Sequence, residues 1–205
     1  MKLRKRCYIL CVLLIPFVGI NAQNDSNLAA LSISLGTNFI DNTGSQNPVN
    51  FLSDFDNMAF SRPIEVYVGY ELNNKIELFL GTSLNRFKSG QNVDGVFITE
   101  NVDYSAVDAG VRYFPRNFKI GRDSSIKPYA HLGIGTHNLI VNQPTVNSGI
   151  GMQYFINPMV GIYANGNAKF SLDQEFFQSN HFQYSIGIIF KPFNTDYNDC
   201  GLYRN

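Results

Sequence analysis

The chain contains three histidines, His131, His137 and His181, and imidazole is the side chain best suited to general-base catalysis or metal binding near neutral pH. A hydrolytic site would place a histidine beside a serine and an orienting carboxylate. His181 and Ser185 fall on one face of an expected strand but stand four residues apart. We therefore predict no catalytic residue.

Metal-binding patterns are equally incomplete. Six strand residues separate His131 from His137, a distance of about 20 Å. Asp54 and Asp56 resemble a fragment of a calcium-binding loop without its remaining ligands. We predict neither a metal site nor a cofactor.

Charged residues on one strand face indicate an internal polar network. Glu71 and Glu77 face each other across a tight turn, which is repulsive unless a cation lies near them. Arg112 is the expected partner, within ion-pair distance of Glu77. The predicted set consists of Glu65, Glu71, Glu77, Asp108 and Arg112. We interpret it as structural, with a proton relay or a gate as alternatives.

The elements that would position these residues are strands, because alternation of apolar and polar residues dominates the chain. Eight such segments are expected, at about 29–40, 63–72, 76–88, 100–114, 126–138, 146–156, 160–170 and 181–191. Three-residue loops at 73–75 and 157–159 would pair Leu72 with Ile76 and Ile156 with Val160. The other connections are longer, and antiparallel pairing places most long ones at one end.

The two faces of the expected sheet differ in an unusual way. One face is apolar in every strand, as in Phe182, Tyr184, Ile186, Ile188 and Phe190 of the last one. The opposite face carries carboxylates, an arginine, amides and many glycines. A soluble barrel would hide the apolar face, but its surface would then be rich in glycine and poor in charge. The simpler interpretation is a closed barrel with the apolar face towards lipid and the polar face inside.

The two ends of the chain suggest secretion. Residues 1–22 combine four basic residues with an apolar run that is too short for a membrane helix, which is typical of a cleavable signal peptide. Removing them leaves 12 basic and 16 acidic residues, a net charge of −4 that argues against a nucleic-acid partner. Only Cys200 would remain, which excludes an internal disulfide.

One long connection carries an apolar cluster. Phe51, Phe55 and Met58 stand at helical spacing with Leu52 beside them, so a short helix is expected at 51–58. Packing over the barrel mouth is the preferred interpretation, and binding a partner is the alternative.

Four segments carry a resemblance to a known class: "YSAVDAGVRYFP" (104–115), "KPYAHLGIGTHN" (127–138), "GIGMQYFINPMVGIYANG" (149–166) and "YSIGIIFKPF" (184–193). They make residues 28–193 resemble the small outer-membrane β-barrel proteins of Gram-negative bacteria, the OmpA-like or OmpX-like eight-stranded class within the wider porin family. The chain is especially similar to the outer membrane protein beta-barrel domain proteins of the Bacteroidetes.

The resemblance implies an all-β, eight-stranded, antiparallel up-and-down transmembrane barrel over residues 23–193, followed by a short periplasmic tail over 194–205. It implies outer-membrane lipid and the barrel assembly machinery as partners. Ser185, Gly187, Phe190 and Phe193 loosely match the class's assembly signal in the last strand.

The function expected from these features is a non-enzymatic outer-membrane protein with a structural, adhesive or surface-interaction role through its long extracellular loops. A narrow pore is a further option. The alternatives are a lipid-modifying barrel enzyme, disfavoured by the missing histidine–serine arrangement, and a soluble secreted barrel that binds an apolar ligand.

Overall fold

The computed structural model describes residues 31–43, 55–120, 124–139, 142–172 and 180–192. The predicted signal peptide, the predicted tail with Cys200, and the residues Phe51, Leu52, Asp54 and Phe193 lie outside this part of the chain. No helix in the described ranges is long and apolar enough to span a membrane.

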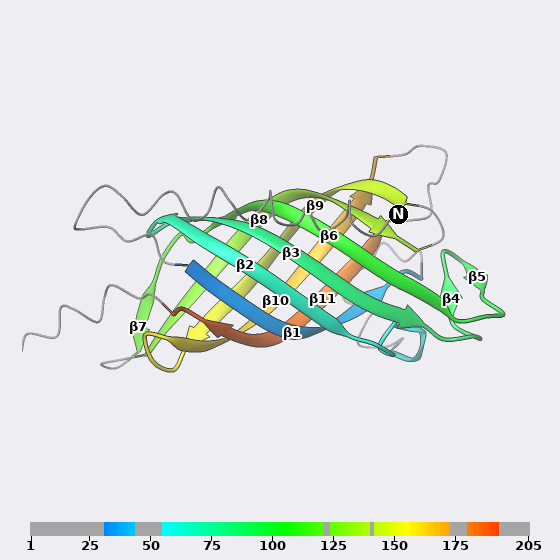
Figure 1. Ribbon diagram of the computed structural model, residues 1–205, viewed down its shortest axis with the longest axis horizontal. Helices are drawn as coiled ribbons and strands as arrows, with labels where there is room; N and C mark the ends of the chain where they lie inside the picture. Colours follow the sequence, from blue (N-terminus) through cyan, green and yellow to red (C-terminus); the bar gives the residue numbers. More distant parts are fainter. Residues whose placement is uncertain (1–30, 44–54, 121–123, 140–141, 173–179, 193–205) are drawn as a thin grey trace, which may run out of the picture.

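Eight long strands form the wall of the molecule (Figure 1). They are β1 (Leu31–Asp41), β2 (Ile64–Asn73), β3 (Ile76–Phe87), β6 (Val102–Tyr113), β8 (Ser124–Asn138), β9 (Asn142–Phe155), β10 (Val160–Ser171) and β11 (His181–Phe190). All eight predicted strands are therefore confirmed, with ends shifted by a few residues.

The eight strands close into an antiparallel barrel. Each pairs with its neighbours along the chain, and β1 pairs with β11 to join the first strand to the last. The short strand β7 stands between β6 and β8 in the chain, but β6 and β8 pair directly with each other. Because every wall strand has a partner on both sides, the predicted all-β, eight-stranded barrel is confirmed.

Three short strands were not predicted. β4 (Asn92–Val93) and β5 (Val96–Phe97) form a small hairpin in the connection from β3 to β6. β7 (Phe118–Ile120) pairs with the first residues of β8. In Figure 1 the hairpin lies at one end of the barrel and β7 at the other.

The two ends also differ in their connections. The end that carries the hairpin holds the connections 42–63, 88–101, 139–141 and 172–180, and we call it the loop end. The other end holds the connections 74–75, 114–123 and 156–159, and we call it the turn end. The two-ended arrangement expected from the sequence is confirmed.

The turn between β2 and β3 corrects one predicted register. Asn73 Oδ1 accepts hydrogen bonds from the backbone N–H groups of Lys75 (2.9 Å) and Ile76 (3.0 Å), which stabilises a two-residue turn. Asn73 therefore pairs with Ile76, and Leu72 becomes the extra residue of a bulge. The predicted pairing of Leu72 with Ile76 is wrong, whereas that of Glu71 with Glu77 is confirmed.

The turn between β9 and β10 follows the expected register. Asn157 Oδ1 accepts from the N–H groups of Met159 (2.9 Å) and Val160 (2.8 Å). Ile156 N–H donates to the Val160 carbonyl at 3.0 Å, so the predicted pairing of these two residues is confirmed.

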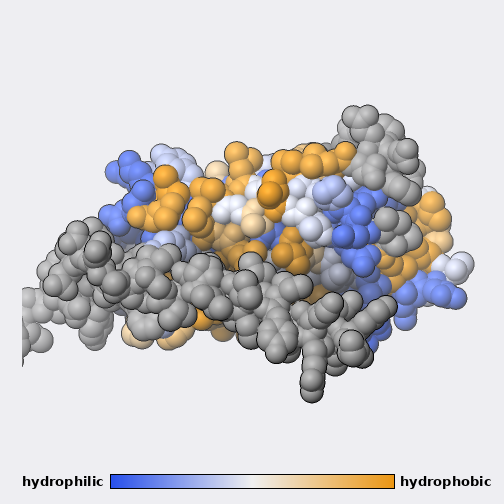
Figure 2. Space-filling view, turned by 45° about the horizontal axis from the view of Figure 1, so that its top comes forward, coloured by the Kyte–Doolittle hydropathy of each residue, from blue (hydrophilic) through white to orange (hydrophobic). Residues whose placement is uncertain are grey.

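The outer face of the wall is apolar on every strand. Its exposed large residues are Ile33, Leu35, Ile64, Val68, Leu72, Leu78, Leu80, Leu84, Val107, Val111, Tyr113, Leu132, Ile134, Val146, Ile150, Met152, Ile162, Phe170, Ile186, Ile188 and Phe190. Figure 2 shows hydrophobic residues over the middle of the visible wall and most hydrophilic ones towards the two ends. The predicted division into an apolar outside and a polar inside is confirmed.

Candidate functional site: the charged barrel interior

The interior holds layers of paired charges, and the first lies near the turn end. Glu71 Oε1 accepts a hydrogen bond from Lys191 Nζ, and Lys127 Nζ lies 3.8 Å from the same oxygen. Both ammonium groups also lie over the Phe155 ring, at 4.7 Å for Lys191 and 5.6 Å for Lys127. Glu71 therefore meets two cations, neither of which is the predicted Arg112.

The second layer is the ion pair that the register predicted. Arg112 Nη1 donates to Glu77 Oε1 at 2.6 Å, and Ser32 Oγ donates to Glu77 Oε2 at 3.4 Å. Three rings surround the guanidinium, with centroids 4.7 to 5.3 Å from Cζ: Tyr67, Phe79 and Tyr129. Charge pairing and cation–π contact both hold Arg112, which is 4% exposed.

The third layer contains a carboxylate that is held by neutral donors. Glu65 is fully buried. Its oxygens accept hydrogen bonds from Ser185 Oγ (2.7 Å), Gln183 Nε2 (2.5 Å) and Tyr163 Oη (3.0 Å). Three donors from β10 and β11 thus replace a direct counter-ion.

The fourth layer is a second buried ion pair. Lys169 Nζ donates to Asp108 Oδ2 at 2.7 Å, and Asn147 Nδ2 donates to Asp108 Oδ1 at 2.7 Å. Both charged side chains are almost completely buried. Burial makes the pair costly to break, because either charge left alone has no access to water.

A histidine and tyrosine cluster lies next, towards the loop end. Tyr104 Oη and His181 Nε2 are 2.9 Å apart. The His137 ring stacks on Tyr104 with centroids 6.0 Å apart, and its centroid lies 4.8 Å from that of His181. His131 lies elsewhere, against Phe79 at 5.8 Å. The sequence did not predict this cluster, because β8 and β11 are not neighbours and no local pattern relates them.

Apolar residues from the wall and from two loops close the loop end, and we call them the mouth cluster. Its buried members are Ile40, Ala59, Phe87, Val93, Tyr104 and Ala106. Ala59 comes from the connection after β1 and exchanges backbone hydrogen bonds with Ile40 at 2.9 and 3.3 Å. Val93 comes from the hairpin. The short helix predicted at 51–58 appears, within the described residues, as a single 3-10 turn at Phe55–Asn57, followed by buried Met58.

Three interior lysines, Lys127, Lys169 and Lys191, were not among the residues predicted from the sequence. Each follows the inward alternation of its strand: Lys169, for example, is two and four residues beyond the inward Asn167 and Asn165. Extending the period-two pattern to the strand ends would have found them. With Arg112 they balance the four carboxylates of Glu65, Glu71, Glu77 and Asp108.

Several interior glycines lie opposite tyrosines whose rings fill the space beside them. Tyr67 faces Gly81, Tyr129 faces Gly151 and Tyr163 faces Gly187 across neighbouring strands. A Cβ added to any of these glycines would overlap the ring of the facing tyrosine. The glycines therefore provide the room in which large rings fill the barrel.

Three residues of the predicted assembly signal, Ser185, Gly187 and Phe190, lie on β11 and divide between its two faces, whereas Phe193 lies outside the described residues. Ser185 and Gly187 face the interior, where Ser185 bonds Glu65 and Gly187 lies against Tyr163. Phe190 faces outward and is 40% exposed. Nothing in these contacts tests the assembly role itself.

Within the described ranges, no group of three or more histidine, cysteine or carboxylate side chains is arranged to hold a metal ion. Ser185 and His181 also have other partners, Glu65 and Tyr104. Chemically, the interior is therefore a set of ion pairs and hydrogen bonds among packed aromatic rings.

Known proteins resemble this chain in structure only. No protein-family model and no curated protein matches it. Neisserial surface protein A is similar with a TM-score of 0.48 at 11% identity, over 79% of this chain and 96% of that chain. The N-terminal β-barrel domain of Pseudomonas aeruginosa OprF gives 0.47 at 15% identity, with the same coverage of 79% and 96%.

The attachment invasion locus protein Ail of Yersinia pestis is similar with a TM-score of 0.42 at 14% identity, again over 79% of this chain and 96% of that chain. The eight-stranded antiparallel fold of this chain rests on its own strand pairing.

Proposed function

We propose that this chain is a non-enzymatic outer-membrane β-barrel that presents its loop end at the cell surface for interaction with other molecules. The observation that carries the proposal is the apolar outer row, which runs across all eight strands around a charged interior. In water this surface would be an unusually large exposed apolar area, whereas in a bilayer it meets lipid.

The height of the apolar row fits a bilayer. On β3 it extends from Ile76 to Leu84, and nine residues at about 3.3 Å with a tilt of about 40° rise about 20 Å. This is close to the apolar band of about 25 Å in outer-membrane barrels. Beyond Leu84 the outer face becomes charged, with Arg86 Nε 2.5 Å from Asp103 Oδ1.

Hydrogen bonds hold the β4–β5 hairpin of the loop end in a fixed position. The β4–β5 hairpin is held by Asp94 N–H donating to the Asn42 carbonyl at 2.7 Å, and by Gln91 Nε2 donating to the carbonyls of Asp56 and Met58 at 2.8 and 2.7 Å. Its Val96 and Phe97 are 62% and 69% exposed. Exposed apolar residues on a preorganised element favour binding a partner, because little conformational entropy is lost on association.

The interior supports this proposal over the alternatives. A ligand-binding soluble barrel would need an apolar cavity inside, but charged and aromatic side chains fill the described interior. A lipid-modifying enzyme would need a serine activated by a histidine, but Ser185 donates to Glu65 and His181 bonds Tyr104. The mouth cluster and the aromatic layers also argue against an open pore.

A topology experiment tests the proposal. The chain is expressed in a Gram-negative host with an epitope inserted after Gly95 in the hairpin or, as the matched control, after Asn74 in the turn-end loop. We expect outer-membrane fractionation, a shift in gel mobility on boiling, and antibody labelling of intact cells only for the hairpin epitope. A soluble periplasmic product, or surface labelling of the Asn74 epitope alone, would contradict the proposal.

A further inference from the structure

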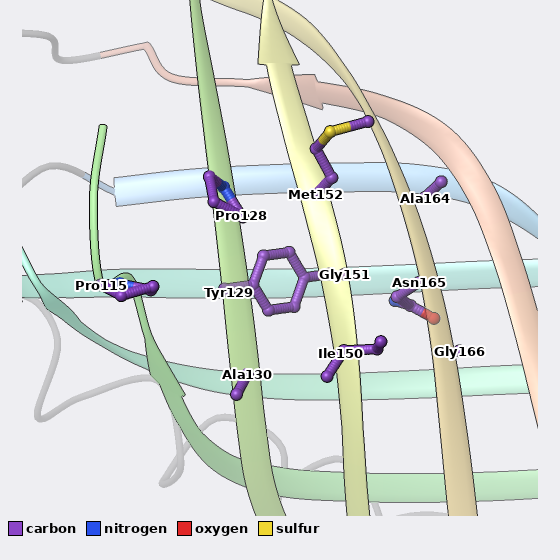
Figure 3. A pocket seen from close by; sticks show the side chains of 10 residues that line it. All are labelled: Pro115, Pro128, Tyr129, Ala130, Ile150, Gly151, Met152, Ala164, Asn165 and Gly166. Atoms are coloured by element: carbon purple, nitrogen blue, oxygen red, sulfur yellow. The ribbon is translucent and has the colours of Figure 1, made fainter. Parts of the chain in front are cut away.

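A shallow groove of about 610 Å³ lies in the outer wall formed by β8, β9 and β10 (Figure 3). Its lining includes Ala130 of β8, Ile150 and Met152 of β9, and Ala164 and Gly166 of β10. None of the lining residues is charged. The groove therefore belongs to the apolar outer surface.

Strand register explains why the wall is hollow here. Ile150 of β9 pairs with Ala130 on one side and with Gly166 on the other. Met152 pairs with Ala164 of β10 and, on the other side, with Pro128 of β8. Large residues on β9 thus form a ridge between small residues on both neighbours. The troughs run along the strands, which suits an extended hydrocarbon chain.

The floor of the groove is closed from inside. Gly151 separates Ile150 from Met152, and the Tyr129 ring lies against it on the interior side. Tyr129 is 3% exposed. The groove is therefore a surface depression with a rigid base, and no passage into the interior is needed to occupy it.

A cation lies at the turn-end rim of the groove. Phe118 of β7 pairs with Ile126, whose side chain shares the outer row of β8 with Pro128 and Ala130. Arg116 Cζ lies 5.2 Å from the Phe118 ring centroid, so the exposed guanidinium is on this outer face. Pro115, next to Arg116, also lines the groove.

We propose that this groove binds an acyl chain of an anionic phospholipid whose phosphate pairs with Arg116. An apolar trough with a cation at its membrane-edge end complements the two parts of such a lipid. The inference rests on the proposed function, which places the turn end at the periplasmic leaflet.

Tryptophan fluorescence tests the site, because the chain has no native tryptophan. Tyr154→Trp places a reporter on the outer row beside the groove, where Tyr154 pairs with Ile126. Tyr70→Trp is the matched control, since Tyr70 lies on the outer row of β2 near the turn end, on the opposite wall. Each variant is placed in vesicles containing brominated phosphatidylglycerol or brominated phosphatidylcholine at equal mole fraction.

We expect the Tyr154→Trp reporter to prefer phosphatidylglycerol by about fivefold, the factor that corresponds to about 1 kcal/mol for one cation near an anionic lipid surface. The Tyr70→Trp reporter should show no preference. Adding Arg116→Gln should abolish the preference at the groove. Adding Ala164→Phe, which fills the trough, should also reduce it, while Ala109→Phe on the outer row of β6 should not.

Three outcomes would overturn the inference: equal preference at both reporters, an unchanged preference in Arg116→Gln, or a concentration-dependent dimer that shields the Tyr154→Trp reporter from both lipids. If neither reporter is quenched by either lipid, the barrel is not in the bilayer and the proposed function itself fails. Equal quenching of both reporters by both lipids would overturn only the lipid site.

Discussion

At the scale of single residues, the interior glycines and the interior tyrosines depend on each other. The Tyr129 ring occupies the space over Gly151, where an added Cβ would overlap Tyr129 Cζ and would lie 2.8 Å from the Ala164 carbonyl oxygen. Gly166 faces outward, where the nearest atom to an added Cβ is 3.5 Å away, an ordinary contact. Glycine is thus required at position 151, whereas position 166 tolerates a larger side chain.

This difference gives a first prediction. Gly151→Ala should destabilise the barrel by about 1 to 3 kcal/mol, the usual cost of overpacking a filled interior. Gly166→Ala should stay within about 0.5 kcal/mol of wild type, as surface changes usually do. Urea unfolding in lipid vesicles, followed by tyrosine fluorescence, measures both. Equal stability of the two variants would show that the Tyr129 ring moves without cost.

The second prediction concerns the ion pair of Glu77 and Arg112. Arg112→Gln should cost about 3 to 5 kcal/mol, because the fully buried Glu77 carboxylate loses the cation that pairs with it. The double variant Glu77→Gln, Arg112→Met should recover much of this loss, since no buried charge remains unpaired. Urea unfolding in lipid vesicles measures the stability of both variants. Both variants lack the cation–π contacts of Arg112, so a double variant no more stable than Arg112→Gln would show that the unpaired Glu77 carboxylate is not the source of the loss.

The ion pair of Glu77 and Arg112 could be predicted from the sequence, whereas the other interior contacts could not. Glu77 and Arg112 lie on adjacent strands, so alternation and one register were enough to place them together. His137 and His181 meet across the barrel, and their contact depends on the circumference and on the tilt of the strands. Those quantities are properties of the closed barrel and leave no trace in local spacing.

At the scale of elements, the β4–β5 hairpin shows how a short turn motif sets a loop. Asp94 and Gly95 both have positive φ, at 53° and 80°, as a two-residue hairpin turn requires. The Asp-Gly pair between two valines is a known signal for such a turn, although the sequence analysis treated the segment as a long loop. Val93 then packs into the mouth cluster and fixes the hairpin to the barrel.

The third prediction is that docking of the β4–β5 hairpin onto the barrel depends on pH. Burial raises the pKa of the Asp94 carboxyl from 3.8 to about 7, although a hydrogen bond from Asn42 opposes the shift. The docked hairpin thus binds the proton more tightly than the undocked one. Docking should therefore be strongest below about pH 4 and weaken as pH rises through about 7.

Electron paramagnetic resonance of a spin label at Thr99→Cys, in a Cys200→Ser background, measures the docking. The mobile fraction should increase from pH 5 to pH 8 in this protein and stay constant when Asp94→Asn is added. A label at Ile186→Cys on the barrel wall serves as the control. The same pH response in the Asp94→Asn variant would show that another group titrates.

At the scale of the whole molecule, the interior is filled along its length. Tyr67, Phe79, Phe155, Tyr163 and Ile189 form one buried cluster, and the mouth cluster closes the loop end. Strand number explains this, because eight strands enclose a space just wide enough for side chains. The filling could be predicted from the fold. Packing of the segment 51–58 over the mouth was also expected, but Ala59 and Val93 could not be identified as members of the mouth cluster, since they come from loops without a repeating pattern.

The fourth prediction is that the barrel does not conduct ions. In planar bilayers, wild type should give no discrete current steps, while Phe79→Ala combined with Tyr163→Ala should give measurable ones because two rings leave the central cluster. Single-channel recording at matched protein amounts checks this. Wild-type steps as large as those of the double variant would show that the side chains move aside.

The hydrogen bonds of Glu65 also bear on the order in which the barrel is made. Its three donors lie 98 to 120 residues further along the chain, on β10 and β11, although Glu65 itself is on β2. A half-built sheet that contains β2 but not β10 and β11 leaves this carboxyl without its three donors, and the last two strands of the barrel supply them. Closure of the barrel between β1 and β11 and completion of the Glu65 hydrogen bonds therefore come together. A chain that stops short of β11 would lack the Gln183 and Ser185 donors, so burying the Glu65 carboxyl at its centre would carry a free-energy cost that the complete barrel avoids.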